Sequence, residues 1–571
     1  MKSGIKSKGG GVGGAVNRLL SRHVEKLLSI PGGKLYRKYV KASKDVEGAQ
    51  DSILREILEQ ASGTVFGAEH GFSSIHSYQD YIERVPIRDY EKHRPYVDRH
   101  TRGEQNVLFK GKPIMYTRSS GTTAEQKLIP ISEYNFNRTI KNRGKLWLYG
   151  LSRHYPGIFA GKDFTIVSPA DEGKTPDGTV TGSLSGLIYQ NIPEFMKLVH
   201  TIPYEVITIA DYEARAYTLL RFGVPSNVTS IYTGNPSTIL NLVTKADQWK
   251  EDLIRDIADG TIKSSLNLEP EIRAMVEERL EPAPERAEEL HRIASKVDRL
   301  RPPDYWPNLG LVHTWTNGNC ALVVPKLRPW FNDDTPMLDF GYIASEINAT
   351  DLLDPATGGS MLAVRSAFYE FSAFEEGESP STFLRAHQLE AGRRYYFYVT
   401  TLSGLYRYDI NDVIEVVGHF NQAPIFKFLF KGKGITNIQG EKLSEEQLID
   451  AVDRATEETG IAHEFFVAYA NADKNVYELY IELLDDTPDN RSAFARSTDE
   501  ALRAVNLEYD AKRHTERLSP LEIISLGKDA FARYRDLRLE EGAFVGQLKW
   551  IHLSGAEITR NRMNKLAACV S

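Results

Sequence analysis

The alternation of strand-like and helix-like segments changes near residue 431, and this change constrains the fold more than any single motif. Before it, short apolar runs at 164–167 and 227–232 are typical of buried strands. Helical stretches such as 211–222 separate these runs, and residues 15–62 carry apolar positions at helical spacing. The first three quarters of the chain is therefore predicted to be a mixed α/β unit that follows a helical lead-in.

The segment after residue 431 has a shorter and different pattern. Two half-buried strands, a helix and a further strand are predicted in this order: 463–469, 477–483, 491–505 and 521–524. Strand–strand–helix–strand on this scale is typical of a small α+β domain.

Chain length agrees with a division into parts, because 571 residues exceed the size of one ordinary domain. We predict a flexible tail at 1–14, a large N-terminal domain at 15–430 and a small C-terminal domain at 431–571. The joint falls in Phe430-Lys-Gly-Lys-Gly434, whose glycines suit a hinge at Lys431, although a plain linker has the same composition.

The composition excludes several classes of function. Hydrophobic residues make up 41% of the chain, enough for a filled core, and a formal net charge of −7 gives no general attraction to nucleic acids or membranes. No apolar run approaches the roughly 18 residues that would span a bilayer, and Cys320 and Cys569 lack a metal-binding spacing. We expect a cytoplasmic, monomeric protein whose partners include neither nucleic acid nor membrane.

A stretch rich in hydroxyl groups, Tyr116–Lys127, is either a linker or surface loop, or a loop that holds phosphate. A phosphate-binding loop needs backbone N–H groups that point one way, small residues and a cation. Ser119-Ser-Gly-Thr-Thr123 and Lys127 supply all three, although the Walker A pattern is absent. The stretch is therefore a candidate phosphate site.

Two further clusters could supply the other groups that a nucleotide requires. Tyr342, Ser345 and Glu346 lie within five residues. An aromatic face can stack on a base, and a carboxylate can hold Mg²⁺ against phosphate oxygens. Asp412 directly precedes a strand-like run, from which a carboxylate can accept hydrogen bonds from ribose hydroxyls.

Each cluster also has a purely structural interpretation. Tyr342 could be a buried tyrosine at a strand end, and Arg407 could form an ion pair that closes a turn, for example with Asp409. Other chemistries find no support, because the sequence lacks H-E-x-x-H, paired metal-binding cysteines and a G-x-S-x-G elbow.

In this order, the three motifs resemble those of the Gretchen Hagen family of acyl-acid amido synthetases, within the adenylate-forming superfamily. Five other segments also resemble family landmarks: Phe66–Phe72, Val85–Tyr90, Trp306–Leu309, Asn421–Pro424 and Asn506–Tyr509. The resemblance covers most of the chain. It implies a large N-terminal adenylate-forming α/β domain, with mixed sheets and a β-barrel-like part, joined by a hinge to the small α+β domain.

The resemblance also implies a role for each matching residue. The loop residues that would bind the triphosphate of ATP, with assistance from Lys127, are Ser119, Ser120, Gly121, Thr122 and Thr123. Tyr342 would pack on the adenine and Ser345 would contact the α-phosphate. Glu346 would act in catalysis by positioning Mg²⁺, and Asp412 would bind the ribose.

Two lysines of the C-terminal part match catalytic positions of the family. Lys442 would reach the nucleotide, and Lys549 matches the lysine that assists adenylation. The chain also departs from the family pattern. Asn411 stands where the family usually has glycine, a change that is mild because asparagine tolerates a left-handed backbone. Lys431 stands where plant members tend to have arginine, and Trp550-Ile-His552 replaces Pro-Arg, which leaves the last catalytic turn open.

The activity that the resemblance implies is ATP-dependent amide synthesis. A carboxylic acid would be adenylated with release of pyrophosphate, and its acyl group would pass to an amine, most plainly an amino acid. Two alternatives remain: a thioester product with coenzyme A or a carrier protein, and a nucleotide-binding relative without turnover. The substrate pocket is expected within 150–240 and 310–345, with Tyr232, Trp315 and Asn319 as candidate contacts.

Overall fold

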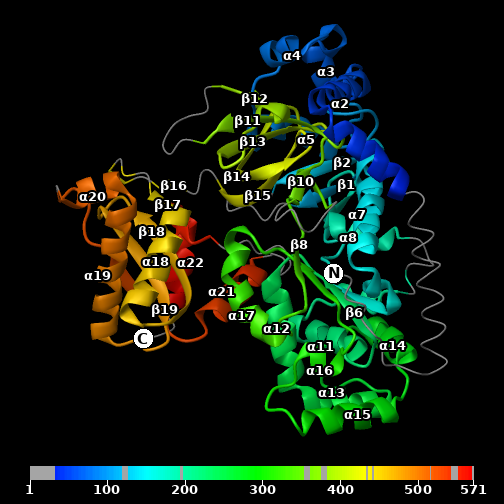
Figure 1. Ribbon diagram of the computed structural model, residues 1–571, viewed down its shortest axis with the longest axis vertical. Helices are drawn as coiled ribbons and strands as arrows, with labels where there is room; N and C mark the ends of the chain where they lie inside the picture. Colours follow the sequence, from blue (N-terminus) through cyan, green and yellow to red (C-terminus); the bar gives the residue numbers. More distant parts are fainter. Residues whose placement is uncertain are drawn as a thin grey trace.

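The computed structural model describes most of the chain. The described residues are 32–118, 127–192, 197, 199–352, 360–374, 382–431, 435–436, 438–439, 441, 443–514, 516–541 and 551–568. Figure 1 shows helices and a large sheet at one end of the molecule, a second sheet with its helices at the other end, and the C-terminal segment at the side. No helix within the described ranges combines the length and the apolar character that crossing a membrane would require.

The chain enters the fold through short helices that begin at polar N-cap residues. They are α2 (Val46–Ala61), α3 (Val65–Glu69), α4 (Tyr78–Arg84) and α5 (Tyr90–Thr101). The N-caps Asp45, Thr64, Ser77 and Asp89 each accept a hydrogen bond from a backbone N–H of the first turn. Residues 32–43 are helical as well, so the predicted helical lead-in is confirmed from residue 32 onward, while 15–31 lie outside the described residues.

These helices contact one end of a seven-stranded sheet whose neighbouring strands are all antiparallel. Its order is β12-β11-β13-β14-β15-β10-β9. The strands are β9 (Thr350–Asp351), β10 (Ser360–Leu362), β11 (Phe368–Ala373), β12 (Leu384–Arg385), β13 (Arg394–Thr400), β14 (Tyr408–Phe420) and β15 (Ala423–Lys431). The strands carry many buried aromatic and aliphatic side chains, which form the core of this half of the large domain.

The other half is built on a parallel sheet of order β3-β6-β7-β8. Its strands are β3 (Lys162–Thr165), β6 (Val228–Tyr232), β7 (Leu311–Thr314) and β8 (Met337–Asp339). Helices that accompany it include α11 (Tyr212–Gly223), α12 (Pro236–Gln248), α13 (Lys250–Asp259), α14 (Pro270–Arg279) and α15 (Pro284–Ala294). The predicted strands at 164–167 and 227–232 and the helix at 211–222 are confirmed, with ends shifted by one or two residues.

A small sheet of order β2-β1-β5-β4 joins the two halves along the chain. It consists of β1 (Pro113–Arg118), β2 (Leu128–Ser132), β4 (Gly173–Lys174) and β5 (Val180–Gly182). β1 and β2 pair antiparallel up to the rung that joins Arg118 and Leu128. The hydroxyl-rich segment therefore connects two paired strands of one sheet and is not a linker between domains. Helices α7 (Lys141–His154) and α8 (Leu184–Gln190) follow β2 and β5.

The C-terminal segment has the predicted α+β pattern. Strands β18 (His463–Asn471), β19 (Val476–Leu483), β20 (Glu522–Ser525) and β21 (Leu553–Ser554) form a sheet of order β20-β19-β18-β21. A separate hairpin contains β16 (Ile435–Thr436) and β17 (Leu443–Ser444). The helices are α18 (Glu445–Thr459), α19 (Pro488–Val505), α20 (Leu507–His514), α21 (Ala530–Glu540) and α22 (Glu557–Ala568).

Polar contacts join the C-terminal segment to the large domain. Lys326 Nζ lies 2.6 Å from a carboxylate oxygen of Glu464. Arg394 donates two hydrogen bonds to Glu446, of 2.9 and 3.2 Å. Both ion pairs are partly exposed, so each contributes little to stability, and they are compatible with a contact that can open.

A buried ion pair ties the helical lead-in to the seven-stranded sheet. Arg407 donates hydrogen bonds of 2.9–3.1 Å to both carboxylate oxygens of Glu370, and the two side chains are 5% and 1% exposed. The remaining nitrogen of the guanidinium donates to the carbonyls of Ile82 and Val85 at the end of α4. The expected alternative of an Arg407–Asp409 ion pair is therefore wrong, because Glu370 takes this cation.

Replacing Arg407 with methionine should lower the free energy of unfolding by about 3–5 kcal/mol, because Glu370 would remain buried without its cation. Denaturant unfolding checks this, with Arg393→Met as the matched control. Arg393 pairs with Glu390 at a site where both side chains are about two-thirds exposed, so its loss should cost less than about 1 kcal/mol. Equal losses for the two variants would contradict the role assigned to the buried pair.

Candidate functional site

Ser345 and Glu346 occupy the tip of a tight turn. An isolated antiparallel bridge pairs Ile343 with Asn348, and the N–H of Ala344 donates to the carbonyl of Ile347 over 2.8 Å. The two tip residues are half-buried. Such a turn presents both side chains on one short, well-defined piece of backbone.

The end of β1 contacts this turn directly. Thr117 Oγ1 donates a 3.1 Å hydrogen bond to the carbonyl of Ser345, and Ser345 Oγ donates over 3.1 Å to the carbonyl of Arg118. Arg118 directly precedes Ser119–Gln126 in the chain, so the point at which the hydroxyl-rich stretch leaves β1 lies beside Ser345. Ser119–Gln126 themselves lie outside the described residues, and the roles of Ser119, Ser120, Gly121, Thr122 and Thr123 remain predictions.

The far end of the hydroxyl-rich segment is also fixed. Lys127 Nζ lies over the ring of Tyr90, 5.7 Å from its centroid. The Tyr90 hydroxyl accepts a 2.8 Å hydrogen bond from the N–H of Leu128 and lies 3.1 Å from its carbonyl, to which it donates. A cation is thus held where the segment re-enters the sheet.

Asp412 lies on β14 and is 1% exposed. Its backbone pairs with Phe397 on one side and with Lys431, the last residue of β15, on the other. The hydroxyl of Tyr342 donates a hydrogen bond to Asp412 Oδ2. Burial, followed by the negative charge of Asp412, holds the pKa of Tyr342 well above its ordinary value, so the hydroxyl stays protonated and donates.

The ring of Tyr342 lies inside the core. It is 6% exposed, and it packs edge to face against Phe397 and Phe428, with centroids 5.2 and 6.2 Å away. The structural interpretation of a buried tyrosine therefore describes this ring correctly. A contact between Tyr342 and adenine remains a prediction, while the hydrogen bond to Asp412 gives the residue a second role in orienting that carboxylate.

A bulge in β14 sets the position of Asp412. Phe397 pairs with Asp412, whereas the next residue of β13, Tyr398, pairs with Asp409. The extra residues include Asn411, whose φ is +58° and whose N–H donates to Asp409 Oδ1 over 2.8 Å. Asn411 thus adopts the left-handed backbone that asparagine was expected to tolerate there.

The carboxylates of Glu346 and Asp412 both lie close enough to buried Tyr408 to affect its pKa. Burial holds the pKa of Tyr408 well above its ordinary value, and the nearby charges of Glu346 and Asp412 add to this rise. The turn at Ser345, the bulge of β14 and the end of β1 thus bring together residues that are far apart in the sequence.

A half-buried carboxylate beside hydroxyl groups fits a magnesium ion that also binds phosphate oxygens and water, since Mg²⁺ takes only one or two protein carboxylates at such sites. Glu346 is such a carboxylate. No cluster of three or more histidine, cysteine, aspartate or glutamate side chains that could hold a metal occurs among the residues the structure describes.

An aromatic cluster lies at the carboxyl ends of the parallel strands. Tyr232 ends β6, is 9% exposed and packs edge to face on Trp147 and His313. The ring of His313 is nearly parallel to those of Trp147 and Phe340, with centroids 5.4 and 4.0 Å away, and the latter two rings contact each other at 6.3 Å. Ligands of α/β proteins bind at this edge of a parallel sheet, so the cluster is a candidate wall for an apolar substrate.

Of the two other candidate substrate residues, Trp315 has a described side chain and Asn319 does not. Trp315 Nε1 donates a 3.1 Å hydrogen bond to the carbonyl of Gly341, next to Tyr342. Trp315 therefore links the parallel sheet to the turn that carries Ser345. The side chain of Asn319 lies outside the described residues.

The lysines predicted for the C-terminal part cannot be placed. Lys442, Lys549 and the side chain of Lys431 lie outside the described residues. The end of the altered segment after Lys549 is described: the ring of His552 packs against that of Phe466 at a tilt of 38°, and its Nδ1 lies 2.9 Å from the carbonyl oxygen of Phe466. Burial lowers the pKa of His552 to about 4, so this residue is a neutral part of the domain core.

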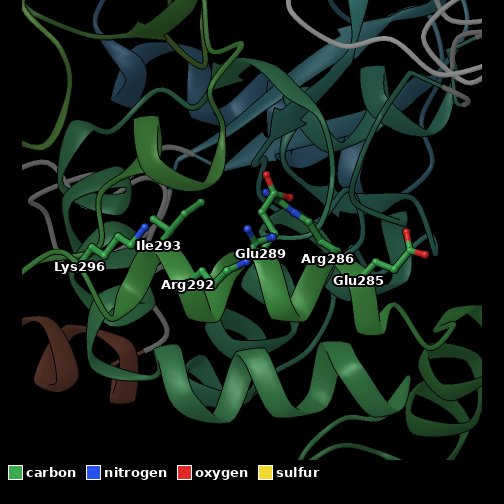
Figure 2. A pocket seen from close by; sticks show the side chains of 6 residues that line it. All are labelled: Glu285, Arg286, Glu289, Arg292, Ile293 and Lys296. Atoms are coloured by element: carbon green, nitrogen blue, oxygen red, sulfur yellow. The ribbon is translucent and has the colours of Figure 1, made fainter.

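A hollow of the described surface lies away from these residues. It measures about 670 Å³ and is lined by residues of α15 and the turn after it. Figure 2 shows that its six side chains come from one helical segment, and four of them are Glu285, Arg286, Glu289 and Arg292. An open depression along a single charged helix lacks the convergent groups of a binding site.

Comparisons with known proteins identify the family. Residues 35–337, 360–431 and 446–557 match, in order, the GH3 family N-terminal, central and C-terminal domains. The chain belongs to the GH3 family.

Full-length relatives agree with this assignment. The chain is 26% identical over 549 residues to the indole-3-acetic acid-amido synthetase GH3.3 of Arabidopsis thaliana, which covers 90% of this chain and 91% of the relative. The fold matches the structure of AtGH3.15 acyl acid amido synthetase in complex with 2,4-DB, with a TM-score of 0.81, 23% identity and coverage of 94% and 96%. It also matches 2-hydroxyisobutyryl-CoA ligase in the postadenylation state, with a TM-score of 0.51, 11% identity and coverage of 92% of each chain. The adenylate-forming fold, with a large N-terminal and a smaller C-terminal domain, is therefore confirmed.

Sequence reasoning missed several residues of this region: Thr117, Trp147, His313 and Phe340. Only His313 carried a signal, because a histidine inside an apolar strand run is unusual. The others gain their position through packing between distant segments.

Replacing Asn411 with valine should strain the left-handed backbone by roughly 1–2 kcal/mol and move Asp412, whereas Asn411→Gly should be tolerated. Calorimetric titration with ATP should show weaker binding for the valine variant only. Asn421, in the β14–β15 turn with φ +54°, provides the matched control. Asn421→Val should lower stability without changing nucleotide affinity, and a similar loss of affinity there would contradict the role of the bulge.

Proposed function

We propose that this chain is an ATP-dependent acyl-acid amido synthetase, which adenylates a carboxylic acid and transfers the acyl group to an amino acid. The observation that carries the proposal is the convergence of Ser345, Glu346, Asp412 and the end of β1 at one place in a GH3 family chain. The names of the curated relatives support the same activity. We further propose a monomeric, cytoplasmic enzyme that acts on small molecules, since a net charge of −7 gives no general attraction to nucleic acids or membranes.

The first step must hold two anions together. A carboxylate oxygen of the acid attacks the α-phosphorus of ATP, and pyrophosphate leaves with the electron pair of the broken P–O bond. The hydroxyl of Ser345, the cation of Lys127 and the groups of the hydroxyl-rich segment would stabilise the negative charge that accumulates. A magnesium ion bound through Glu346 would neutralise phosphate oxygens.

Nucleotide orientation would come from Asp412. A buried carboxylate binds ribose hydroxyls well only if its direction is fixed, and the hydroxyl of Tyr342 and the bulge at Asn411 fix it. The aromatic cluster around Tyr232 would contact the apolar part of the acid. Thr117 and Trp315 would hold the turn that carries Ser345.

In the second step the amine attacks the acyl carbon and AMP leaves. Lys442 and Lys549 would come from the C-terminal domain, which would turn about a hinge at Lys431. The exposed ion pairs Lys326–Glu464 and Arg394–Glu446 belong to the orientation seen here, and a turn of the domain would break them at low cost.

Replacing Asp412 with asparagine should lower acid-dependent pyrophosphate–ATP exchange roughly 10- to 100-fold, the range for a lost hydrogen bond to a charged group. A panel of carboxylic acids, each tested for pyrophosphate release, first identifies the acid. Glu415→Gln on the same strand is the matched control, since Glu415 forms a partly exposed ion pair with Lys427. Exchange that persists unchanged in Asp412→Asn would remove this residue from the site.

The product separates the proposal from its nearest alternative. With the acid identified, each amino acid and coenzyme A are offered in turn as acceptor, and the product is analysed by mass spectrometry. An amide supports the proposal, whereas a thioester contradicts it. Nucleotide binding without pyrophosphate release would contradict both.

Replacing Ser120 and Thr122 together with alanine should raise the KM for MgATP at least about tenfold, because hydroxyl hydrogen bonds to charged phosphate would be lost. The melting temperature should not change. The pair Thr261→Ala and Ser264→Ala, at exposed positions far along the chain, is the matched control. Unchanged nucleotide kinetics in the loop variant would contradict a phosphate-binding role for the segment.

A further inference from the structure

A carboxylate close to the candidate site is buried and unpaired. Glu172 lies directly before β4, and its N–H donates a 2.8 Å hydrogen bond to the carbonyl of Thr181. Both of its carboxylate oxygens are buried, and neither has a hydrogen-bond partner among the described residues. Such a group is costly for a fold, and natural proteins keep few of them.

A cation with unused donors lies within electrostatic reach of this carboxylate. Arg118 ends β1, and its positive charge partly opposes the effect of burial on Glu172. Arg118 Nε donates to Thr181 Oγ1 over 3.0 Å, and this is the one hydrogen bond of the guanidinium found within the described ranges. The two charged groups form no direct ion pair there, so the terminal nitrogens of Arg118 and the oxygens of Glu172 keep hydrogen-bonding capacity that no described residue uses.

The local backbone leaves room for this arginine. A Cβ atom at Gly173 would lie 2.5 Å from Arg118 Nη2, so any other residue there would displace the guanidinium. Thr181 holds the same side chain from the neighbouring strand through its hydroxyl. Gly173 on β4 and Thr181 on β5 thus determine where the Arg118 side chain lies.

The pair lies at the start of the hydroxyl-rich segment. The carbonyl of Arg118 accepts the hydrogen bond of Ser345, the residue proposed to contact the α-phosphate. A second substrate that meets the acyl-adenylate must bind close to this residue, because the acyl carbon is attached to that phosphate.

We propose that Arg118 and Glu172 form the binding site for the amino acid acceptor, with Arg118 binding its α-carboxylate and Glu172 binding its α-ammonium group. An α-amino acid carries one cation and one anion on the same carbon atom. An arginine fork matches a carboxylate in a bidentate manner, and a carboxylate accepts hydrogen bonds from an ammonium group. This inference rests on the proposed function for the reaction, but the binding itself is measurable without turnover.

The electrostatics of Glu172 agree with a site that awaits a cation. Burial raises the pKa of Glu172 to about 8 in the absence of a ligand, and Arg118 acts in the opposite direction. Tyr204 and Asp171 are titratable groups near it: burial, and then the charges of Asp171 and Glu172, raise the pKa of Tyr204. An ammonium group that binds there would lower the pKa of Glu172 and favour its ionised form.

Variants of the full-length chain test the site. An equal mixture of the standard amino acids is titrated while the melting temperature is followed, and the mixture of their α-amides serves as the probe without a carboxylate. Glu172→Gln and Arg118→Met should weaken amino acid binding roughly 10- to 100-fold. Arg118→Met should also lose the preference for amino acids over amides. Asp171→Asn and Lys174→Met, exposed neighbours of the same charge types, should bind as the wild type does.

Adenylation provides the readout that keeps this inference separate from the proposed function. Hydroxylamine traps an acyl-adenylate without any amino acid site, so hydroxamate formation by the wild type and by the Asp171→Asn control reports adenylation alone. Absence of hydroxamate in the wild type would overturn the proposed function and leave the binding result standing. Unchanged amino acid affinity in both variants, or equal losses in the two controls, would overturn the assignment of Arg118 and Glu172.

The pH dependence of stability gives a further check. A carboxyl whose folded pKa is about 8 keeps its proton in the folded state while the unfolded state loses it above about 4.5. Its contribution to stability therefore falls as pH rises from about 4.5 to about 8. Without ligand, Glu172→Gln should melt at a higher temperature than the wild type at pH 8, with a smaller difference at pH 5. The opposite trend would contradict a buried, unpaired carboxylate.

Discussion

The buried ion pair between Arg407 and Glu370 is the interaction on which the arrangement of the large domain depends. Two charges removed from water stabilise a fold only if every donor and acceptor around them is satisfied. Here the guanidinium also needs two carbonyls at the end of α4, and Glu370 accepts a hydrogen bond from the hydroxyl of Tyr78. The helical lead-in, β11 and the turn into β14 must therefore assemble together, and β14 carries Asp412.

The elements themselves were predictable from the sequence wherever burial produced a clear period. The runs at 463–469 and 477–483 alternate in sequence, and the run at 227–232 is rich in β-branched residues, so each predicts a strand. The predicted half-burial is wrong for 477–483, because every residue of β19 is buried. Partners were not predictable, because the period of a strand tells which face is buried and not which strand lies beside it. The parallel pairing of β1 with β5, which brings Arg118 to Thr181 and Gly173, is a case in point.

The candidate site shows the same limit. Ser345, Glu346 and Asp412 could be found because each lies in a motif whose residue types and order are unusual. The burial of Tyr342 and the partners of Arg407 could not, since both follow from packing between segments that are distant in the chain. Thr117 is a similar case. Threonine is common in strands, and only the structure shows that its hydroxyl donates a hydrogen bond to the carbonyl of Ser345.

One rung of the β14–β15 ladder joins Asp412 to Lys431. If β15 ends in the hinge, the carboxylate that would hold the ribose and the pivot of the C-terminal domain share a pair of backbone hydrogen-bonding residues. Binding and domain orientation are then thermodynamically linked. If one orientation binds the nucleotide more tightly by some factor, the nucleotide shifts the equilibrium toward that orientation by the same factor. If ATP and AMP differ in their effect on this balance, departure of pyrophosphate by itself shifts it.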